Sequence, residues 1–500
     1  MDTLSTTLPS SRLSRDNLVP PRSHTARAGF WAICLALAFV GLFTKNGIVT
    51  SAAIMVVPIL GLLLWREGEP PVLLFGCAFQ WLQATAAIFY CNHFGMTLDA
   101  AFGSNVLDAA TWLSIVAVIV LAVGIRLGYI RAGSSQRAAL EADAARMNIG
   151  KIGILYGISV IVAGVLSALA WRLPSVTQPL LAIAALKWAV IFLLCYTVLH
   201  QRRGYGVLLT CIGVEFAMGL FGIFSNFKDV FFVLVVAAMS SPLALKGRRL
   251  AATITCCVVL FVLGVIWSAI KMDYRAFLTD DSSAGDEAIP IERKFEKMAD
   301  LIESITWDNF TDGMDALVMR VSYVNLFALT LENVPARVPY ENGELWKESV
   351  VRVLTPRFLF PDKPVTDDSE RTRTYTGLNV AGAESGTSIG IGYVGESYID
   401  FGPVGMFAPI FLLGLLYGAI NRFFITRTRY KLLGSAFAVS ILIFSAYEIE
   451  TSNIKLVGGV IAAALVSVVI YKAFAGTIMG ALQKAPMPSE VRQRSVPSLR

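Results

Sequence analysis

Glu396 is a candidate proton acceptor in this 500-residue sequence, and Glu448 and Glu450 are further acids that could reach the same cavity. Glu396 stands between Gly395 and Ser397, in a stretch with few other charges. A carboxylate with little charge around it has a raised proton affinity, which suits a general base at neutral pH. A carboxylate at a helix end or in a loop, bound to backbone N–H groups, is an equally good interpretation. The residue types leave both interpretations open.

Basic residues upstream of Glu396 form a candidate site for a phosphate-like anion. Arg320 lies in an otherwise apolar helical pattern over 314–331, where an unpaired guanidinium is costly. Its planar fork can pair bidentately with phosphate oxygens. A salt bridge to an acid such as Asp315 or Glu332 would satisfy it equally well.

A second basic set flanks the turn expected at Pro356. Arg352 and Arg357, together with Lys363, lie beside an apolar FLF segment. Each is an ordinary solvated charge when taken singly, but their clustering favours an anion site.

Three further charges lie in or at the ends of apolar spans. Lys228 could hold an anionic lipid head group, although snorkelling to the interface is the default for such a lysine. Lys187 and Glu215 lie inside spans and are functional candidates by default. A mutual pair between neighbouring helices would satisfy both without any chemistry.

The histidine content argues against a metal site. The three histidines are His24, His93 and His200, all outside 271–403, so a histidine-based zinc site is excluded there. The acidic run 367–370 could bind a hard cation, but short acidic runs are usually solvated. No phosphate loop, dinucleotide-binding glycine motif or nucleophile elbow occurs. We therefore expect no metal and no cofactor.

Apolar spans must position these residues. The chain is 55% hydrophobic and 16% charged, with a mean hydropathy of +0.64, which is typical of a polytopic membrane protein. Windows long enough to cross a hydrocarbon core recur twelve times. They lie at about 29–45, 47–65, 70–91, 106–128, 152–171, 180–199, 206–224, 228–245, 250–270, 404–421, 432–448 and 455–473.

Basic residues between the spans predict the orientation. One set of connections, with both termini, holds 24 Lys or Arg, and the short connections of the other set hold 4. This asymmetry predicts cytoplasmic termini and an outer segment at 271–403. It also explains the net charge of +6 without a nucleic-acid partner.

The spans divide the chain into five predicted segments. These are a cytoplasmic N-terminal tail (1–28), spans one to nine (29–270), a large outer loop (271–403), spans ten to twelve (404–473) and a cytoplasmic C-terminal tail (474–500). We expect an all-α fold.

The outer loop has its own helical patterns. An amphipathic helix is predicted over 293–305, an apolar one over 314–331 and a shorter one over 344–354. Prolines then forbid regular helix, and Gly402-Pro403 predicts a break just before span ten.

Two segments of this loop carry a family resemblance. The sequence RVLTPRFLFPDKP (352–364), followed by TSIGIGYVGESYIDFGPVGM (387–406), resembles the Wzy-type O-antigen and exopolysaccharide repeat-unit polymerases. The likeness covers about 220–425 and the span count.

The resemblance implies a metal-independent, GT-C-like glycosyltransferase of about twelve spans in the bacterial inner membrane. Such enzymes polymerise undecaprenyl-pyrophosphate-linked oligosaccharide repeat units at the periplasmic face, among membrane lipid, with chain-length regulator and flippase proteins as partners. Carried over to this chain, Glu396, Arg320 and Arg357 are catalytic, Glu396 as the base. The residues expected to bind the pyrophosphate are Arg352, Lys363, Lys228 and Tyr398.

Two alternatives accompany this reading. O-antigen ligases are similar in architecture but usually place a histidine in the large loop, which this chain lacks. A transporter or flippase of lipid-linked saccharides is disfavoured because no matching pair of Gly/Pro-broken spans occurs in the two halves.

Overall fold

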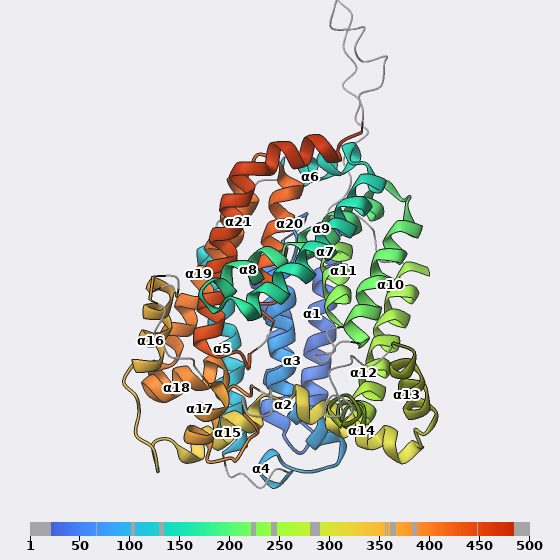
Figure 1. Cartoon of the computed structure of the whole chain (residues 1–500). Helices are drawn as coiled ribbons and strands as arrows, with labels where there is room; N and C mark the ends of the chain where they lie inside the picture. Colours follow the sequence, from blue (N-terminus) through green and yellow to red (C-terminus); the bar gives the residue numbers. More distant parts are fainter. Residues whose placement is uncertain are drawn as a thin grey trace, which may run out of the picture.

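The computed structural model describes residues 22–484 except 67, 102–105, 130–134, 222–226, 242–247, 281–290, 356, 358, 361–366, 383–387 and 448. Within these residues all regular structure is helical, with one 3-10 turn at Pro174–Val176 (Figure 1). The all-α prediction is thus confirmed for the described chain.

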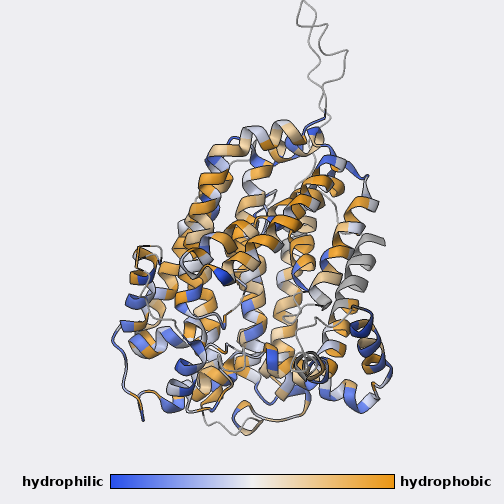
Figure 2. Cartoon of the chain, viewed as in Figure 1, coloured by the Kyte–Doolittle hydropathy of each residue, from blue (hydrophilic) through white to orange (hydrophobic). Residues whose placement is uncertain are grey.

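Seven helical units of the described chain are long and apolar enough to cross a membrane. They are α2 (Gly47–Leu64), α3 (Val72–His93), α5 (Leu107–Gly128), α7 (Ile149–Arg172), the pair α8 (Thr177–Ala184) and α9 (Lys187–Gln201), α19 (Phe407–Thr426) and α21 (Asn453–Leu482). The protein is therefore a helical, multi-pass membrane protein. Figure 2 shows the apolar residues concentrated in the body of the bundle.

Five further helices coincide with the remaining predicted spans. They are α1 (Arg22–Gly41), α10 (Tyr205–Phe221), α11 (Asp229–Ser240), α12 (Arg248–Asp280) and α20 (Lys431–Leu442). Each of the twelve predicted windows thus contains a helix, while twelve complete crossings stay a prediction.

The remaining helices lie in the connections. They are α4 (Leu98–Ala101), α6 (Ser135–Arg146), α13 (Ile291–Glu303), α14 (Trp307–Val321), α15 (Val324–Asn333), α16 (Glu344–Leu354), α17 (Asp368–Thr376) and α18 (Gly392–Gly405). The predicted helices over 293–305 and 344–354 are confirmed by α13 and α16, and Gly402 breaks α18 with a φ of 69°. Helix α17 was not predicted.

The connections gather at two opposite ends of the bundle (Figure 1). At one, called the α6 end, Lys484 N donates to Arg146 O over 3.0 Å. At the other, called the loop end, Lys455 Nζ lies 2.7 Å from Asp368 Oδ2. Both groupings join segments that were predicted to share a side of the membrane. Which end faces the cytoplasm stays a prediction.

The predicted single helix over 314–331 is wrong. Helices α14 and α15 meet at an angle of 54° around Ser322 and Tyr323. At this bend Tyr323 N donates to Gln83 O, in the middle of α3, over 3.0 Å. The backbone of α3 and the bend in the loop therefore meet inside the bundle, where lipid cannot reach the open backbone.

Span eleven also differs from its prediction, which placed it at 432–448. Helix α20 ends at Leu442, and the described residues of 443–452, which are all but 448, are irregular before α21 begins. Gln80 Nε2 donates to Ala446 O over 2.9 Å, and Ile449 N donates to Gln83 Oε1 over 3.2 Å. Irregular backbone is tolerated within a membrane protein when side chains satisfy it in this way.

Helices α5 and α19 form a close small-residue seam. A Cβ on Gly414 would lie 3.0 Å from the Cα of Gly124, and a Cβ on Gly418 would lie 3.0 Å from that of Gly128. Glycines four residues apart on both helices let the two backbones touch. Close packing of this kind holds helices together in a membrane, where the hydrophobic effect does not act between them.

Candidate functional site

Helix α18 places Glu396 against the irregular 443–452 segment. It begins at Gly392, whose φ of 84° favours glycine, and a Cβ there would lie 2.8 Å from the Cα of Glu450. Gly395 N donates to the hydroxyl of Tyr323 over 2.8 Å, which ties α18 to the α14–α15 bend. The two interrupted parts of the bundle therefore flank the same turn of α18.

The Glu396 carboxylate is buried and held on both oxygens. The residue is 2% exposed; Oε1 lies 3.4 Å from Arg371 Nη1, and Oε2 accepts from Asn453 N over 2.8 Å. Burial raises the pKa of Glu396 to about 7, while Arg371 and the Asn453 N–H oppose that rise. Glu396 can therefore gain and lose a proton near neutral pH. Its bond to the N-terminus of α21 confirms the alternative interpretation of a carboxylate bound to backbone N–H, while its role as a base stays a prediction.

A line of alternating charges runs outward from Glu396. Arg371 also pairs through Nη2 with Glu348 Oε2, and Glu348 Oε1 binds Arg352 Nη2 over 2.9 Å. Both arginine side chains are 14% exposed. Charge-assisted hydrogen bonds of this kind fix guanidinium groups in position. We call Glu396, Arg371, Glu348 and Arg352 the carboxylate–arginine cluster.

Helix α16 is fastened to α18 by a carboxylate and an indole. Asp400 accepts from Leu345 N over 3.1 Å and from Trp346 N over 2.8 Å, at the start of α16. Trp346 Nε1 donates to Ser397 Oγ over 2.9 Å. A carboxylate at a helix N-terminus binds the free N–H groups and the positive end of the helix dipole. These bonds fix Glu348 and Arg352 relative to Glu396.

Of the predicted anion-binding residues, Arg352 belongs to this cluster and two others do not. Arg320 is exposed in the last turn of α14, and in the described residues it forms no ion pair with Asp315 or Glu332. A cation is favourable at that helix end. Arg357 lies half-buried just after α16, and Lys363 lies outside the described residues.

Tyr398, which is predicted to bind the substrate, is bonded within the protein. The residue is 4% exposed, and its hydroxyl donates to Val334 O over 2.9 Å. The Tyr340 hydroxyl lies 3.4 Å from it. Because Tyr398 is buried and already bonded, its role in the described structure is to pack α18 against the chain after α15.

Lys228 lies near two aromatic rings, and Lys187 forms an ion pair. The Lys228 ammonium lies 5.4 Å from the ring centre of Tyr447 and 6.0 Å from that of Phe232. Lys187 Nζ lies 2.7 Å from Glu215 Oε2. The mutual pair expected as the simpler alternative for these two intramembrane charges is thus confirmed.

The acidic run 367–370 is used by the protein itself. Asp367 begins α17 and accepts from Ser369 N over 2.9 Å, while Asp368 pairs with Lys455. Asp367 thus binds the first turn of α17, and Asp368 forms an ion pair with the surface lysine. Asp368 is 4% exposed, so the alternative of a solvated run is wrong at this residue, whereas Glu370 is exposed.

Sequence reasoning missed Arg371 and Glu348, the centre of the cluster. The signal for Glu348 was present, because Glu348 and Arg352 are four residues apart in a helix that was predicted. Arg371 gave no comparable signal. It depends on α17, which follows a proline-rich stretch and has no apolar periodicity.

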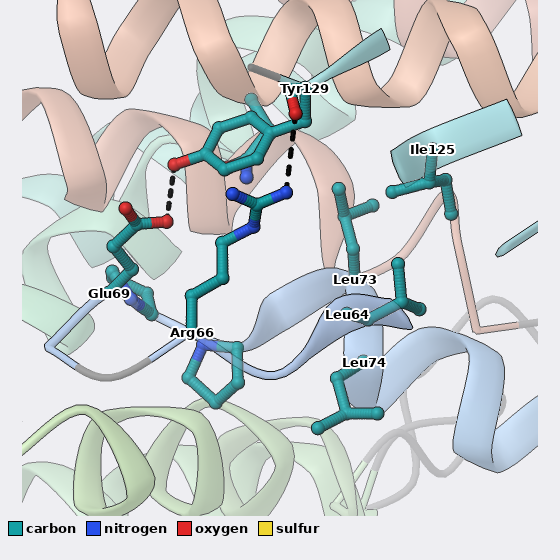
Figure 3. A pocket seen from close by; sticks show the side chains of 10 residues that line it. Leu64, Arg66, Glu69, Leu73, Leu74, Ile125 and Tyr129 are labelled. Carbon is teal, nitrogen blue, oxygen red and sulfur yellow. Dashed lines mark hydrogen bonds between the residues drawn. The ribbon is translucent and has the colours of Figure 1, made fainter. Parts of the chain in front are cut away.

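A second polar site lies in the loop between α2 and α3 and is lined by the end of α5 (Figure 3). The Tyr129 hydroxyl donates to Glu69, and Arg66 Nη2 donates to Tyr129 O over 3.2 Å. The cavity beside them, of about 20 Å³, is also lined by Asn421. It has room for one water molecule, so its size suits a buried structural water that links these elements.

The comparisons with known proteins place the chain in a family without assigning an activity. No curated protein and no solved structure matches it. A family described as a domain of unknown function, DUF8712, matches residues 71–451, from the start of α3 to the end of the irregular segment before α21. The chain belongs to this DUF8712 family.

Proposed function

We propose that the protein is a metal-independent membrane glycosyltransferase that polymerises undecaprenyl-pyrophosphate-linked oligosaccharide repeat units into O-antigen or exopolysaccharide. The observation that carries the proposal is the buried Glu396 carboxylate, with a pKa of about 7, beside the Arg371 guanidinium. The sequence resemblance supplies the substrate class. In this proposal the fold is GT-C-like with twelve spans, the loop end faces the periplasm, and both termini are cytoplasmic.

Glu396 has the properties of a general base for a sugar hydroxyl. A base acts best when its pKa lies near the working pH, because it is then both ionised often enough and able to take the proton. Arg371 holds one carboxylate oxygen and the Asn453 N–H holds the other, which fixes the orientation of the group. We assign Glu396 to deprotonating the acceptor hydroxyl as that oxygen attacks the anomeric carbon.

The charges of the cluster change in the direction that the leaving group requires. With Glu396 ionised, two arginines face two carboxylates and the cluster is neutral. Once Glu396 takes the proton, the cluster carries one net positive charge. That charge develops as the pyrophosphate leaves with its electron pair, so fixed cations stabilise the transition state more than the ground state.

Four further basic residues extend this cationic region in the proposal. Arg357 and Lys363 continue the chain beyond α16, while Arg320 and Lys228 contact the lipid-linked substrate as it approaches. Lys228 is the best supported of these, because rings border it on two sides. Phe79 lies 5.4 Å from Phe232 and 5.2 Å from Tyr447 between ring centres, which gives an aromatic wall suited to an isoprenoid chain.

Purified protein in lipid vesicles, supplied with lipid-linked repeat units and a metal chelator, tests the proposal. A polymerase makes a ladder of products, each longer by one repeat unit, and Glu396→Gln does not. Transfer of one glycan to a different acceptor without a ladder indicates a ligase. Movement of intact substrate across the vesicle membrane indicates a transporter, and either outcome overturns the polymerase assignment.

A further inference from the structure

Three buried residues near Glu396 carry polar atoms without hydrogen-bond partners in the described part of the chain. Asn453 is 0% exposed, and both side-chain polar atoms are unpaired; Ser452 Oγ, at 1%, and Asp368 Oδ1, at 4%, are also unpaired. Leaving such a buried group unsatisfied destabilises a protein. Groups of this kind are normally satisfied by ordered water.

The residues that carry these atoms lie in one region beside α18. Asn453 N binds the Glu396 carboxylate directly. A Cβ on Gly390 would lie 2.9 Å from Glu450 O, 3.7 Å from Asp368 Oδ2 and 3.8 Å from Ser452 N, so Asp368 and Ser452 both lie close to Gly390. The region contains two carboxylates, a hydroxyl and an amide, which together offer both donors and acceptors to water.

The region also reaches the protein surface. Asp368 Oδ2 lies 2.7 Å from Lys455 Nζ, whose side chain is 49% exposed. Lys455 in turn donates to Ser388 Oγ over 2.7 Å. The arginine side of Glu396 leads instead to the carboxylate–arginine cluster, which carries one net positive charge once Glu396 is protonated and therefore repels a proton. The Asp368 side is therefore the favourable direction for a proton to leave.

We propose that buried water bound by Asp368, Ser452 and Asn453 forms the proton exit of Glu396, running to the surface at Lys455. This inference rests on the proposed function for its role in turnover. Chains of carboxylates and water are the usual proton relays within membrane proteins. Asp368 and Asn453 are positioning residues here, since they act through water on Glu396.

The reaction requires such an exit. Each cycle forms a bond from the acceptor oxygen to the anomeric carbon and breaks the bond from that carbon to the pyrophosphate oxygen. The electron pair leaves with the pyrophosphate, and the hydroxyl proton remains on Glu396. Glu396 must release one proton to solvent before it can act again.

The charged and titratable groups around Glu396 come from every element that packs on it. They are Arg371 and Asp368 of α17, Glu348 and Arg352 of α16, Tyr323 at the α14–α15 bend, Glu450 in the 443–452 segment and Lys455 of α21. Of these, Asp368 is the acid that faces both Glu396 and the surface lysine.

Infrared spectroscopy of the protein in vesicles tests the relay without any substrate. The C=O band of protonated Glu396, identified by its loss in Glu396→Gln, shifts when the buffer is changed to D₂O. We expect Asn453→Leu and Asp368→Asn to slow this exchange by roughly tenfold or more. Ser467→Ala is the matched control, because Ser467 Oγ is also buried and unpaired in α21 but lies fourteen residues away.

The outcomes separate the relay from the polymerase assignment. Exchange as fast in both variants as in Ser467→Ala overturns the relay, whatever the activity. Slowed exchange in a protein that makes no glycan ladder supports the relay and refutes the proposed function. If Asn453→Leu does not accumulate, Ser452→Ala replaces it, because that change removes only an unpaired hydroxyl. Slower turnover that small diffusible buffers restore is the expected result in an active protein.

Discussion

The guanidinium of Arg371 and the carboxylate of Glu396 form an ion pair with 3.4 Å between Nη1 and Oε1, and Glu396 is almost completely buried. The attraction of Arg371 lowers the pKa of Glu396, yet burial outweighs it and the pKa stays near 7. The balance between these two effects sets the pH range in which Glu396 can work.

Glycan transfer should depend on pH through Glu396. A base must be ionised, so the rate should rise as the pH rises through about 7 and then level off. Glu396→Gln should lower the rate by roughly 10²–10⁴-fold, the usual contribution of a general base. Glu344→Gln, which alters an exposed carboxylate paired with Lys347, should leave rate and profile unchanged. A normal rate in Glu396→Gln would exclude Glu396 as the base.

Changing its two charged neighbours should move this profile in opposite directions. Arg371 lowers the pKa of Glu396, so Arg371→Gln should shift the midpoint to higher pH. Asp368 raises that pKa, so Asp368→Asn should shift the midpoint to lower pH. Rate profiles measured from pH 5 to 9, roughly two units either side of the wild-type midpoint, test both shifts. The exposed Arg337 provides the control Arg337→Gln. Shifts of the same sign would contradict the assigned geometry.

The α5–α19 seam should not tolerate side chains. A Cβ on Gly124 or Gly414 would overlap backbone of the facing helix, so Gly124→Leu should reduce stability by about 1–3 kcal/mol or prevent accumulation. Gly458→Leu is the control, since nothing lies within 4 Å of a Cβ at that position in α21. Thermal unfolding in detergent compares the two variants. Equal midpoints would show that the helices do not pack closely.

Gln83 should hold the irregular 443–452 segment in place. Gln83→Leu leaves the buried Ile449 N–H without its acceptor, which should destabilise that segment by about 1–3 kcal/mol. Hydrogen exchange of 443–452 should accelerate, while exchange in α5 should not. Leu82→Ala changes a more exposed neighbour in α3 and should have no effect there. Unchanged exchange in Gln83→Leu would mean that other contacts fix the segment.

The orientation can be measured with single cysteines. Lys455→Cys should react with an impermeant maleimide applied to the periplasmic side, whereas Lys484→Cys should react only after the membrane is broken. Lys455 has a half-exposed side chain and Lys484 is exposed, at opposite ends of the bundle. The opposite pattern of labelling would invert the predicted topology.

The sequence predicts the helices well and the interruptions poorly. Long apolar windows identify the spans, and a strong helical period identifies α13 and α16. Both patterns are local. The bend at Tyr323 and the end of α20 at Leu442 have no local cause such as proline. They depend on Gln80 and Gln83, far away in the chain, whose polar groups stabilise an open backbone.

The candidate site shows the same difference between local patterns and contacts made far along the chain. Glu396 could be identified from its own surroundings, since an acid among small and aromatic residues is unusual in itself. Its partner Arg371 could not, because an arginine among polar residues is the ordinary surface pattern. Only the position of α17, which packs on α15 and brings Arg371 within 3.4 Å of Glu396, turns it into a buried contact.

The hydrogen bonds of α3 also bear on how the protein is made. The partners of Gln80 and Gln83 at Ala446 and Ile449 lie 366 residues further along the chain. When α3 enters the membrane during synthesis, those acceptors and donors do not yet exist. Until the last part of the chain emerges from the ribosome, two amide side chains in a membrane-spanning helix must find temporary partners in water, neighbouring helices or the insertion machinery. Assembly of the bundle therefore ends only with the arrival of its final helices.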